Sequence, residues 1–145
     1  MNNTPEEERK PQKSKGAANK RKGSNAERFF AQRFREIGSP PFKRCVTSRL
    51  GSRLHDNAGI DLIFLPFNPQ IKAGYDRGLN PSKELKYLDD RIDEIFPEDA
   101  PERDKVNVLI HRKTVGRGVK RTKYDDIVSM TYEDFEALIK KIEKW

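Results

Sequence analysis

The chain has 145 residues, enough for one domain, and its 34% hydrophobic and 37% charged residues predict a core of modest size. The net charge of +7 favours an anionic partner, and nucleic acid is preferred over a membrane surface because no basic amphipathic helix stands out. No stretch has the length of a transmembrane helix or the apolar character of a signal peptide, and the lone Cys45 excludes an intramolecular disulfide and a Cys-based zinc cluster, which fits a reducing compartment.

The first 22 residues form a basic tail. They contain many Lys and Arg residues but no aromatic residue and no apolar period, which is typical of a segment that is disordered in isolation. Such a tail either keeps the protein soluble or adds contacts to phosphates. Residues 23–145 are then expected to form a single domain.

The first regular element is a helix that begins after Ser24, a good N-cap, and ends at Gly38. Strands are predicted at residues 42–48 and 60–67, with a polar loop between them. The second of these strands is almost continuously apolar, so it is expected to be buried on both faces.

Residues 68 to about 104 have the character of an insertion. A loop leads to a helix that begins at Pro81, and an apolar stripe runs along it, formed by Leu85, Leu88, Ile92 and Ile95. Its acidic residues are interpreted as a solvated helix face rather than a metal site.

The C-terminal part offers two more strands, at residues 105–114 and 125–130, separated by a basic turn that contains glycine. A last helix follows Thr131 as N-cap. Its apolar stripe, expected to be buried, consists of Phe135, Leu138, Ile139 and Ile142. The order α-β-β-(inserted α)-β-β-α predicts an α/β (α+β) fold in which helices flank a mixed β-sheet.

Four residues could carry chemistry: Glu27 in the first helix, Asp61 at the start of the second strand, and His111 and Lys113 at the end of the third. A nuclease site needs carboxylates that hold a divalent cation at the scissile phosphate. Asp61 would hold the cation together with Glu27, and Lys113 would orient water or offset developing charge. His111 and Lys113 leave the same face of a strand.

Each of these residues also has a purely structural interpretation. Glu27 follows Ser24 at the spacing of a capping box. Asp61 could hydrogen-bond loop amides, Lys113 could end an aggregation-prone strand, and His111 could be an interfacial histidine. Their occurrence together, in this order and on a basic chain, favours the nuclease interpretation.

The segments "GSNAERFFAQRF", "NAGIDLIFLP" and "VNVLIHRKT" together resemble the PD-(D/E)XK nuclease superfamily. Within it, the chain is most similar to Holliday junction resolvase-like endonucleases of phages and prokaryotes. The family pattern is a Glu in the first helix, an Asp in a "G-x-D" strand and an acid-x-Lys on the next strand. Glu27, Gly59, Asp61 and Lys113 match those positions, whereas His111 stands where the family has an acid.

The resemblance implies a restriction-endonuclease-like fold that binds Mg²⁺ or Mn²⁺ through Glu27, Asp61 and His111. It also implies branched DNA as substrate, a homodimer, and the cytoplasm of a prokaryotic or phage-infected cell. A neutral imidazole at His111 removes one negative charge, which would favour Mn²⁺, weaken metal binding or mark an inactive relative. Asp56 in the preceding loop could supply the missing acid.

The DNA-facing surface is expected to lie on two polar loops beside these residues. Such side chains contact phosphates without reading sequence, although loops are polar in any case. The candidates are Arg44, Ser48, Arg49, Ser52, Arg53, Arg117, Lys120, Arg121 and Lys123.

The sequence therefore predicts a metal-dependent, structure-selective DNA endonuclease. Two alternatives remain open: a non-catalytic, basic nucleic-acid-binding protein on a degenerate nuclease fold, and a structural component of a phage or nucleoprotein assembly.

Overall fold

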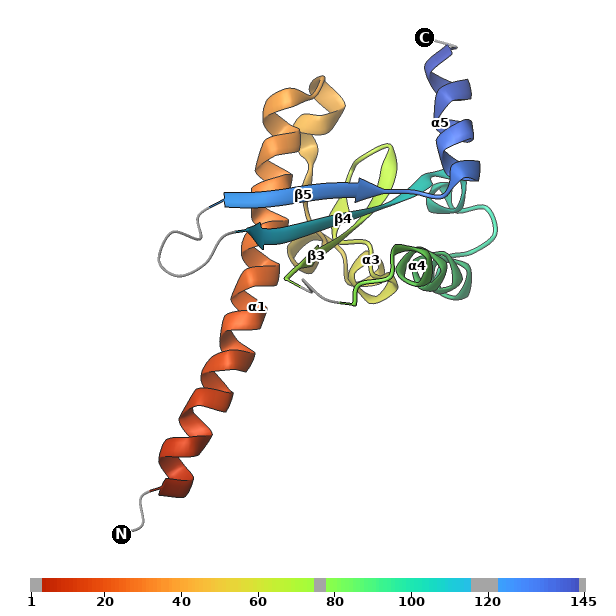
Figure 1. Ribbon diagram of the computed structural model, residues 1–145. Helices are drawn as coiled ribbons and strands as arrows, with labels where there is room; N and C mark the ends of the chain where they lie inside the picture. The colour runs from red at the N-terminus through yellow and green to blue at the C-terminus, as the bar shows by residue number, and fades with distance from the viewer. Residues whose placement is uncertain (1–3, 75–77, 116–122, 144–145) are drawn as a thin grey trace.

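The computed structural model describes residues 4–74, 78–115 and 123–143, which form a mixed sheet flanked by helices (Figure 1). In the three-stranded sheet, β4 (Val106–Val115) lies between β3 (Phe67–Ala73), which is parallel to it, and β5 (Lys123–Ser129), which is antiparallel. The predicted α+β class with helices around a mixed sheet is confirmed. None of the helices in the described ranges is long and apolar enough to cross a membrane.

The prediction of an insertion at residues 68–104 is wrong. This segment begins with strand β3, and α4 (Pro81–Ile95) with the 3-10 helix η2 (Pro101–Asp104) forms the connection from β3 to β4. Parallel neighbours require such a crossover, because a short turn cannot return the chain to the same end of the sheet. The helix itself was predicted correctly, and its Leu85, Leu88 and Ile92 are buried.

The two faces of the sheet are covered by different helices (Figure 1). Ile71 and Ile110 pack against Phe30 and other apolar residues of α1 (Thr4–Ile37) in one buried cluster. A second cluster lies around α4, where Leu88 and Ile92 are buried. Because adjacent residues of a strand point to opposite faces, Gln70 and Lys72 leave β3 on the side away from α1.

Helix α1 begins at Thr4, so the prediction of disorder for residues 1–22 fails for all the residues that the structure describes there. Lys, Glu, Ala, Gln and Arg dominate this segment, and all are good helix formers. Figure 1 shows this half of α1 projecting away from the sheet. Ser24 lies inside the helix and is not an N-cap, which removes the capping-box interpretation of Glu27. The predicted stop at Gly38 is confirmed.

The segment after α1 is more helical than predicted. Residues 42–48 contain the end of a 3-10 helix η1 (Pro40–Arg44) and only a two-residue strand β1 (Val46–Thr47). The predicted polar loop holds two short helices, α2 (Ser48–Gly51) and α3 (Arg53–Ala58). Pro40 and Pro41 favour the tight helix, because their fixed φ suits a first turn.

The predicted strand at residues 60–67 is broken. Its first part, β2 (Leu62–Ile63), pairs antiparallel with β1 in a separate two-stranded sheet. Phe64 has a φ of 68°, which ends the extended conformation before β3 begins at Phe67. The apolar run is therefore continuous in sequence but not in structure.

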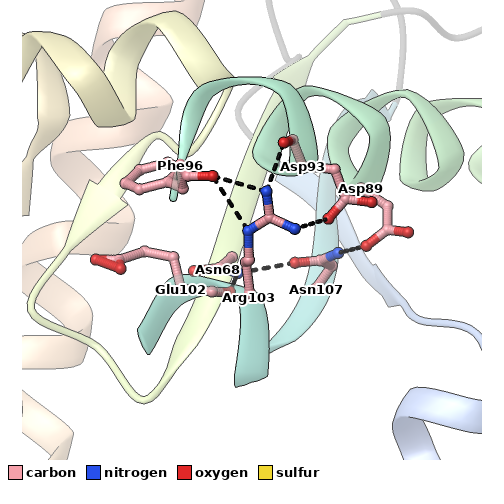
Figure 2. Close-up of polar contacts among 7 residues, drawn as sticks. All are labelled: Asn68, Asp89, Asp93, Phe96, Glu102, Arg103 and Asn107. Carbon is pink, nitrogen blue, oxygen red and sulfur yellow. Dashed lines mark hydrogen bonds and ion pairs between the residues drawn. The ribbon is translucent and has the colours of Figure 1, made fainter. Parts of the chain in front are cut away.

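Buried amide side chains tie β3 and β4 to the crossover (Figure 2). The Nδ2 of Asn68 donates to Oδ1 of Asn107 at 2.9 Å and to the carbonyl of Glu102 at 2.8 Å. The Nδ2 of Asn107 in turn donates to Oδ1 of Asp89 on α4 at 3.2 Å. The guanidinium of Arg103 donates to main-chain carbonyls at the end of α4. This network fixes α4 against the sheet.

The last helix, α5 (Tyr132–Glu143), begins where it was predicted, and Oγ1 of Thr131 accepts from the N–H of Asp134 at 3.1 Å. The prediction that its apolar stripe is buried is wrong, since no residue of α5 is buried. In Figure 1 this helix stands out from the end of β5.

Candidate functional site

A cavity of about 610 Å³ lies at the free edge of β3. The chemistry-bearing residues of its wall come from separate elements: Glu27 from α1, Asp61 from the turn before β2, and Gln70 and Lys72 from β3. Arg49 of α2 also lines it. The two predicted acids therefore share one cavity, as the sequence suggested.

Asp61 is fixed by two hydrogen bonds to the free edge of β3. Its main-chain N–H donates to the carbonyl of Pro69 at 2.8 Å, and its Oδ2 accepts from the N–H of Ile71 at 2.7 Å. Gly59 has a φ of 89°, a conformation that glycine adopts without strain, and it turns the chain into this position. The carboxylate thus occupies the place that a neighbouring strand's carbonyl would take.

Gln70 lines the cavity and carries an unsatisfied side-chain oxygen. The side chain is 7% exposed, and its Oε1 is buried without a hydrogen-bond partner among the described residues. An unpaired buried carbonyl oxygen costs free energy, about 1–3 kcal/mol, unless a ligand satisfies it. A cation is one such ligand, because it accepts electron density from amide oxygens.

The positive charge near the two carboxyl groups does not fully offset the cost of burying them. The pKa of Asp61 is raised to about 7, mainly by burial and also by the nearby Glu27 carboxylate, in spite of the lowering effects of the Ile71 N–H and the Lys72 ammonium. Burial also raises the pKa of Glu27, although Nη2 of Arg49 lies 3.3 Å from its Oε1. Such a site favours an added cation over the empty state.

Lys72 supplies the ammonium group of the cavity. It shares a face of β3 with Gln70, two residues before it, and its Nζ lies 3.9 Å from Oε2 of Glu84 on α4. Its charge lowers the pKa of Asp61. The cavity therefore combines two acids, an amide oxygen and a lysine.

The predicted roles of His111 and Lys113 are not supported by their positions. Both side chains line a different cavity of about 220 Å³, beside Ile127 of β5. The Nε2 of His111 is hydrogen-bonded to the carbonyl of Gly74. Lys113 lies opposite Asp125 in the β4–β5 ladder. His111 and Lys113 lie on β4, the central strand of the sheet, whereas the strand next to Asp61 is β3.

Sequence reasoning missed Gln70 and Lys72 because the polar segment 68–80, which contains Pro69, is typical of a loop. A signal was present: polar Asn68, Gln70 and Lys72 alternate with apolar residues from Phe67 to Ala73, the period of a strand. Pro69 argued against a strand. The structure places its nitrogen on the free edge of the sheet, where no ladder donor is needed.

The two serines predicted to contact phosphates are hydrogen-bonded to other side chains of the protein. Ser48 is buried, with its Oγ 3.4 Å from Oδ1 of Asp56, and Oγ of Ser52 lies 2.7 Å from Nδ1 of His55. Burial therefore keeps Ser48 from contacting DNA as predicted, whereas the phosphate contact of the half-buried Ser52 stays a prediction. Asp56, considered as a replacement acid, raises the pKa of Asp61 by its charge.

The arginines remain available at the surface. Arg49 donates from Nη1 to Oγ of Ser24 at 2.8 Å, and its side chain is 49% exposed at the rim of the cavity. Arg44 is stacked on the Phe64 ring at 4.7 Å, and Arg53 is exposed. Three of the remaining predicted phosphate contacts lie outside the described residues: Arg117, Lys120 and Arg121. The fourth, Lys123, is the first residue of β5.

Among residues 4–74, 78–115 and 123–143, no three His, Cys, Asp or Glu side chains gather closely enough to hold a metal ion. A cation in the large cavity would therefore depend on the two carboxylates and on the Gln70 oxygen. This set is chemically suited to Mg²⁺ or Mn²⁺, both of which accept oxygen ligands.

No family model, curated protein or solved structure matches this chain. Its function therefore has to be inferred from the cavity itself.

Proposed function

We propose that this protein is a divalent-cation-dependent DNA endonuclease whose site consists of Glu27, Asp61, Gln70 and Lys72. The observation that carries the proposal is that Gln70, whose buried Oε1 has no partner among the described residues, lines the same cavity as two carboxyl groups of raised pKa. Each of these features is costly for the protein alone, and one bound cation would relieve all of them.

In this proposal, Asp61 and Gln70 hold Mg²⁺ or Mn²⁺, with Glu27 as the third oxygen donor. The bound cation would supply positive charge at the scissile phosphate and acidify a water molecule. Lys72 would orient the attacking water or offset the negative charge that develops on the phosphate. Arg49, which pairs with Glu27 in the cation-free protein, would be released toward the DNA backbone when Glu27 turns to the cation.

The resemblance to PD-(D/E)XK nucleases supports this proposal in an altered form. The acid-x-Lys element of the pattern would fall on Gln70-Ile71-Lys72 rather than on residues 111–113. Its last residue is again a lysine, and its first is a neutral amide. One negative charge is still missing, so Mn²⁺ is expected to support cleavage at least as well as Mg²⁺.

DNA as the substrate is supported by the net charge of +7 and by the exposed cations near the cavity. Lys22 and Arg49 both line it. Contacts of this kind give affinity that falls steeply with salt and carry no sequence information. Branched DNA remains the proposed substrate on the basis of the resemblance alone.

The decisive experiment incubates the protein with four-way junction, flap and linear DNA in Mg²⁺, in Mn²⁺ and in chelator. Asp61→Asn and Lys72→Met are expected to lower cleavage by about 10²-fold or more while sparing DNA binding, because each removes charge at the reacting phosphate. Lys113→Met is the matched control: it removes a lysine from the neighbouring strand outside the cavity. Equal losses in both lysine variants, or no cleavage with any cation, would contradict the proposal.

A non-catalytic DNA-binding protein is the second candidate, favoured because the part of the chain that the structure describes brings two carboxylates to the cavity where a stronger site would have three. It predicts salt-sensitive DNA binding without cleavage under any condition. Asp61→Asn would then leave DNA binding unchanged or improve it, because a negative charge is lost.

A further inference from the structure

Arg112 holds two surface aromatic rings in place at one end of the sheet. Its guanidinium carbon lies 4.0 Å from the centre of the Tyr124 ring and 3.9 Å from that of the Phe29 ring. Arg112 itself is fixed by the bidentate ion pair with Asp126, at 2.9 and 2.8 Å, and its side chain is only 11% exposed. Tyr124 is nevertheless 52% exposed and Phe29 44%. The two rings are therefore presented to solvent in a fixed position, which the cation on their faces stabilises.

A small cavity of about 100 Å³ opens beside Tyr124, between α1 and the ends of β3 and β4. Three of its lining residues also line the large cavity that contains Asp61: Lys22, Ala73 and Gly74. The two cavities therefore adjoin at the end of β3. An enclosed space of about 150 Å³ accommodates a benzene ring, so this smaller, open space accommodates one planar ring that extends partly into solvent.

The small cavity combines an aromatic face with positive charge. Tyr124 provides the face, and Lys22 provides an exposed side-chain cation where the two cavities meet. An unpaired nucleobase matches both features, because every base has a π face that stacks on an aromatic ring and is linked through its sugar to a phosphate. A free phosphate would leave the ring unused, and an apolar ligand would leave the lysine unused.

We propose that the small cavity binds one unpaired base of the DNA, stacked on Tyr124, while the phosphate of an adjoining nucleotide lies in the large cavity. Arg112 is a positioning residue: it holds the Tyr124 ring still, so little conformational freedom is lost on binding. A base in a duplex is covered on both faces by its neighbours and must first be unstacked. The protein is therefore expected to favour single strands and flaps over linear duplex.

The identity of the ligand as DNA rests on the proposed function, whereas the preference for an unpaired base follows from the small cavity and requires no cleavage. Fluorescence anisotropy of the full chain in chelator therefore tests it. The probes are an oligothymidylate of about 12 nucleotides, an abasic strand of the same length and charge, and a linear duplex. The wild-type protein should bind the oligothymidylate about 10-fold more tightly than the abasic strand, because base–aromatic stacking is lost in the latter.

Tyr124→Ala should bind the two single strands equally and should bind the duplex as the wild type does. Tyr124→Phe should keep the preference, because it keeps the ring. Tyr124→Leu, which fills the space without a π face, should lose the preference and replaces Tyr124→Ala if that variant does not fold. The matched control is Tyr132→Ala, which removes a 75% exposed tyrosine from α5 and should change nothing.

A 2-aminopurine base in the oligothymidylate reports stacking directly, because its fluorescence falls when it stacks. At saturating protein the signal should fall with the wild type and with Tyr124→Phe, and should fall less with Tyr124→Leu. Equal binding of the two single strands by the wild type, or a preference that survives Tyr124→Leu, would overturn the base site and leave the nuclease proposal standing. A preference lost in Tyr124→Leu, together with no cleavage by the wild type, would support the base site and contradict the nuclease alone. A protein that binds no DNA would overturn both.

Discussion

Replacing Asp61 with Asn is expected to stabilise the cation-free protein at neutral and alkaline pH. Asn keeps an oxygen that accepts from the Ile71 N–H, which is 2.7 Å away in the wild type. It removes the charge that burial makes costly. The gain in stability would come at the expense of cation binding, as is usual where a site is destabilised for function.

The magnitude follows from the pKa of Asp61, which burial raises from 3.8 to about 7. The folded state binds the Asp61 proton more tightly than the unfolded state does, so the protonated group stabilises the folded state. This contribution to stability is fully present below about pH 4 and is lost as pH rises through 7. Three pKa units at about 1.4 kcal/mol each give an upper value of about 4 kcal/mol. We therefore expect Asp61→Asn to match the wild type near pH 4 and to exceed it by about 2–4 kcal/mol at pH 8.

Urea denaturation of both proteins from pH 4 to pH 8.5, in chelator, measures this difference. Asp99→Asn, at an exposed loop position, controls for the loss of a carboxylate. Adding Mn²⁺ should raise the stability of the wild type and not that of Asp61→Asn, because a ligand that binds the folded state stabilises it. A stability difference that does not change with pH would refute the inference that Asp61 is destabilised by burial.

Three other substitutions test the elements around the cavity by urea denaturation. Arg112→Ala should lower the free energy of unfolding by about 2–4 kcal/mol. It removes a bidentate ion pair with Asp126, at 2.9 and 2.8 Å, and a stack on aromatic rings. A loss of stability below about 1 kcal/mol would contradict this. Gly59→Ala should lower the free energy of unfolding by about 1–2 kcal/mol, because its φ of 89° is strained for alanine. It should also weaken Mn²⁺ binding, because the new Cβ would lie 3.2 Å from Nε2 of Gln70. An unchanged affinity for Mn²⁺ would count against that contact. Asn68→Ala should lower the free energy of unfolding by about 1–3 kcal/mol, because it leaves the buried Oδ1 of Asn107 without the amide donor and removes one of the two hydrogen bonds to the Glu102 carbonyl. A neutral outcome would mean that water replaces the amide.

The sequence predicted the parts of the site that are local. The local pattern predicts a turn at Gly59 and Asp61 into an apolar run and places Glu27 on a periodic helix. That the two acids share a cavity was expected from the nuclease interpretation and the resemblance, not from local pattern. The fold class followed in the same way from the helix at Pro81 and from the strand at Val106.

The parts that failed depend on tertiary pairing. The strand that lies beside Asp61 decides whether Lys72 or Lys113 approaches it. That strand is β3, and Pro69 makes its sequence look unlike a strand. The exposure of the α5 stripe was also hidden, because an amphipathic helix looks the same in sequence whether its own domain or another chain covers it.

The attachment of Asp61 to one strand edge has a consequence for the newly made chain. A slip of β3 by a single residue would turn Gln70 and Lys72 to the face that packs on α1 and would move Ile71 to the face that they now occupy. Both carboxylates have been synthesised by residue 61, yet β3 has its parallel neighbour only after Val106 to Arg112 have been synthesised. An incomplete or misregistered chain therefore carries the acids without the pocket, and if the proposed site binds a cation, cation affinity would report whether the sheet has been assembled correctly.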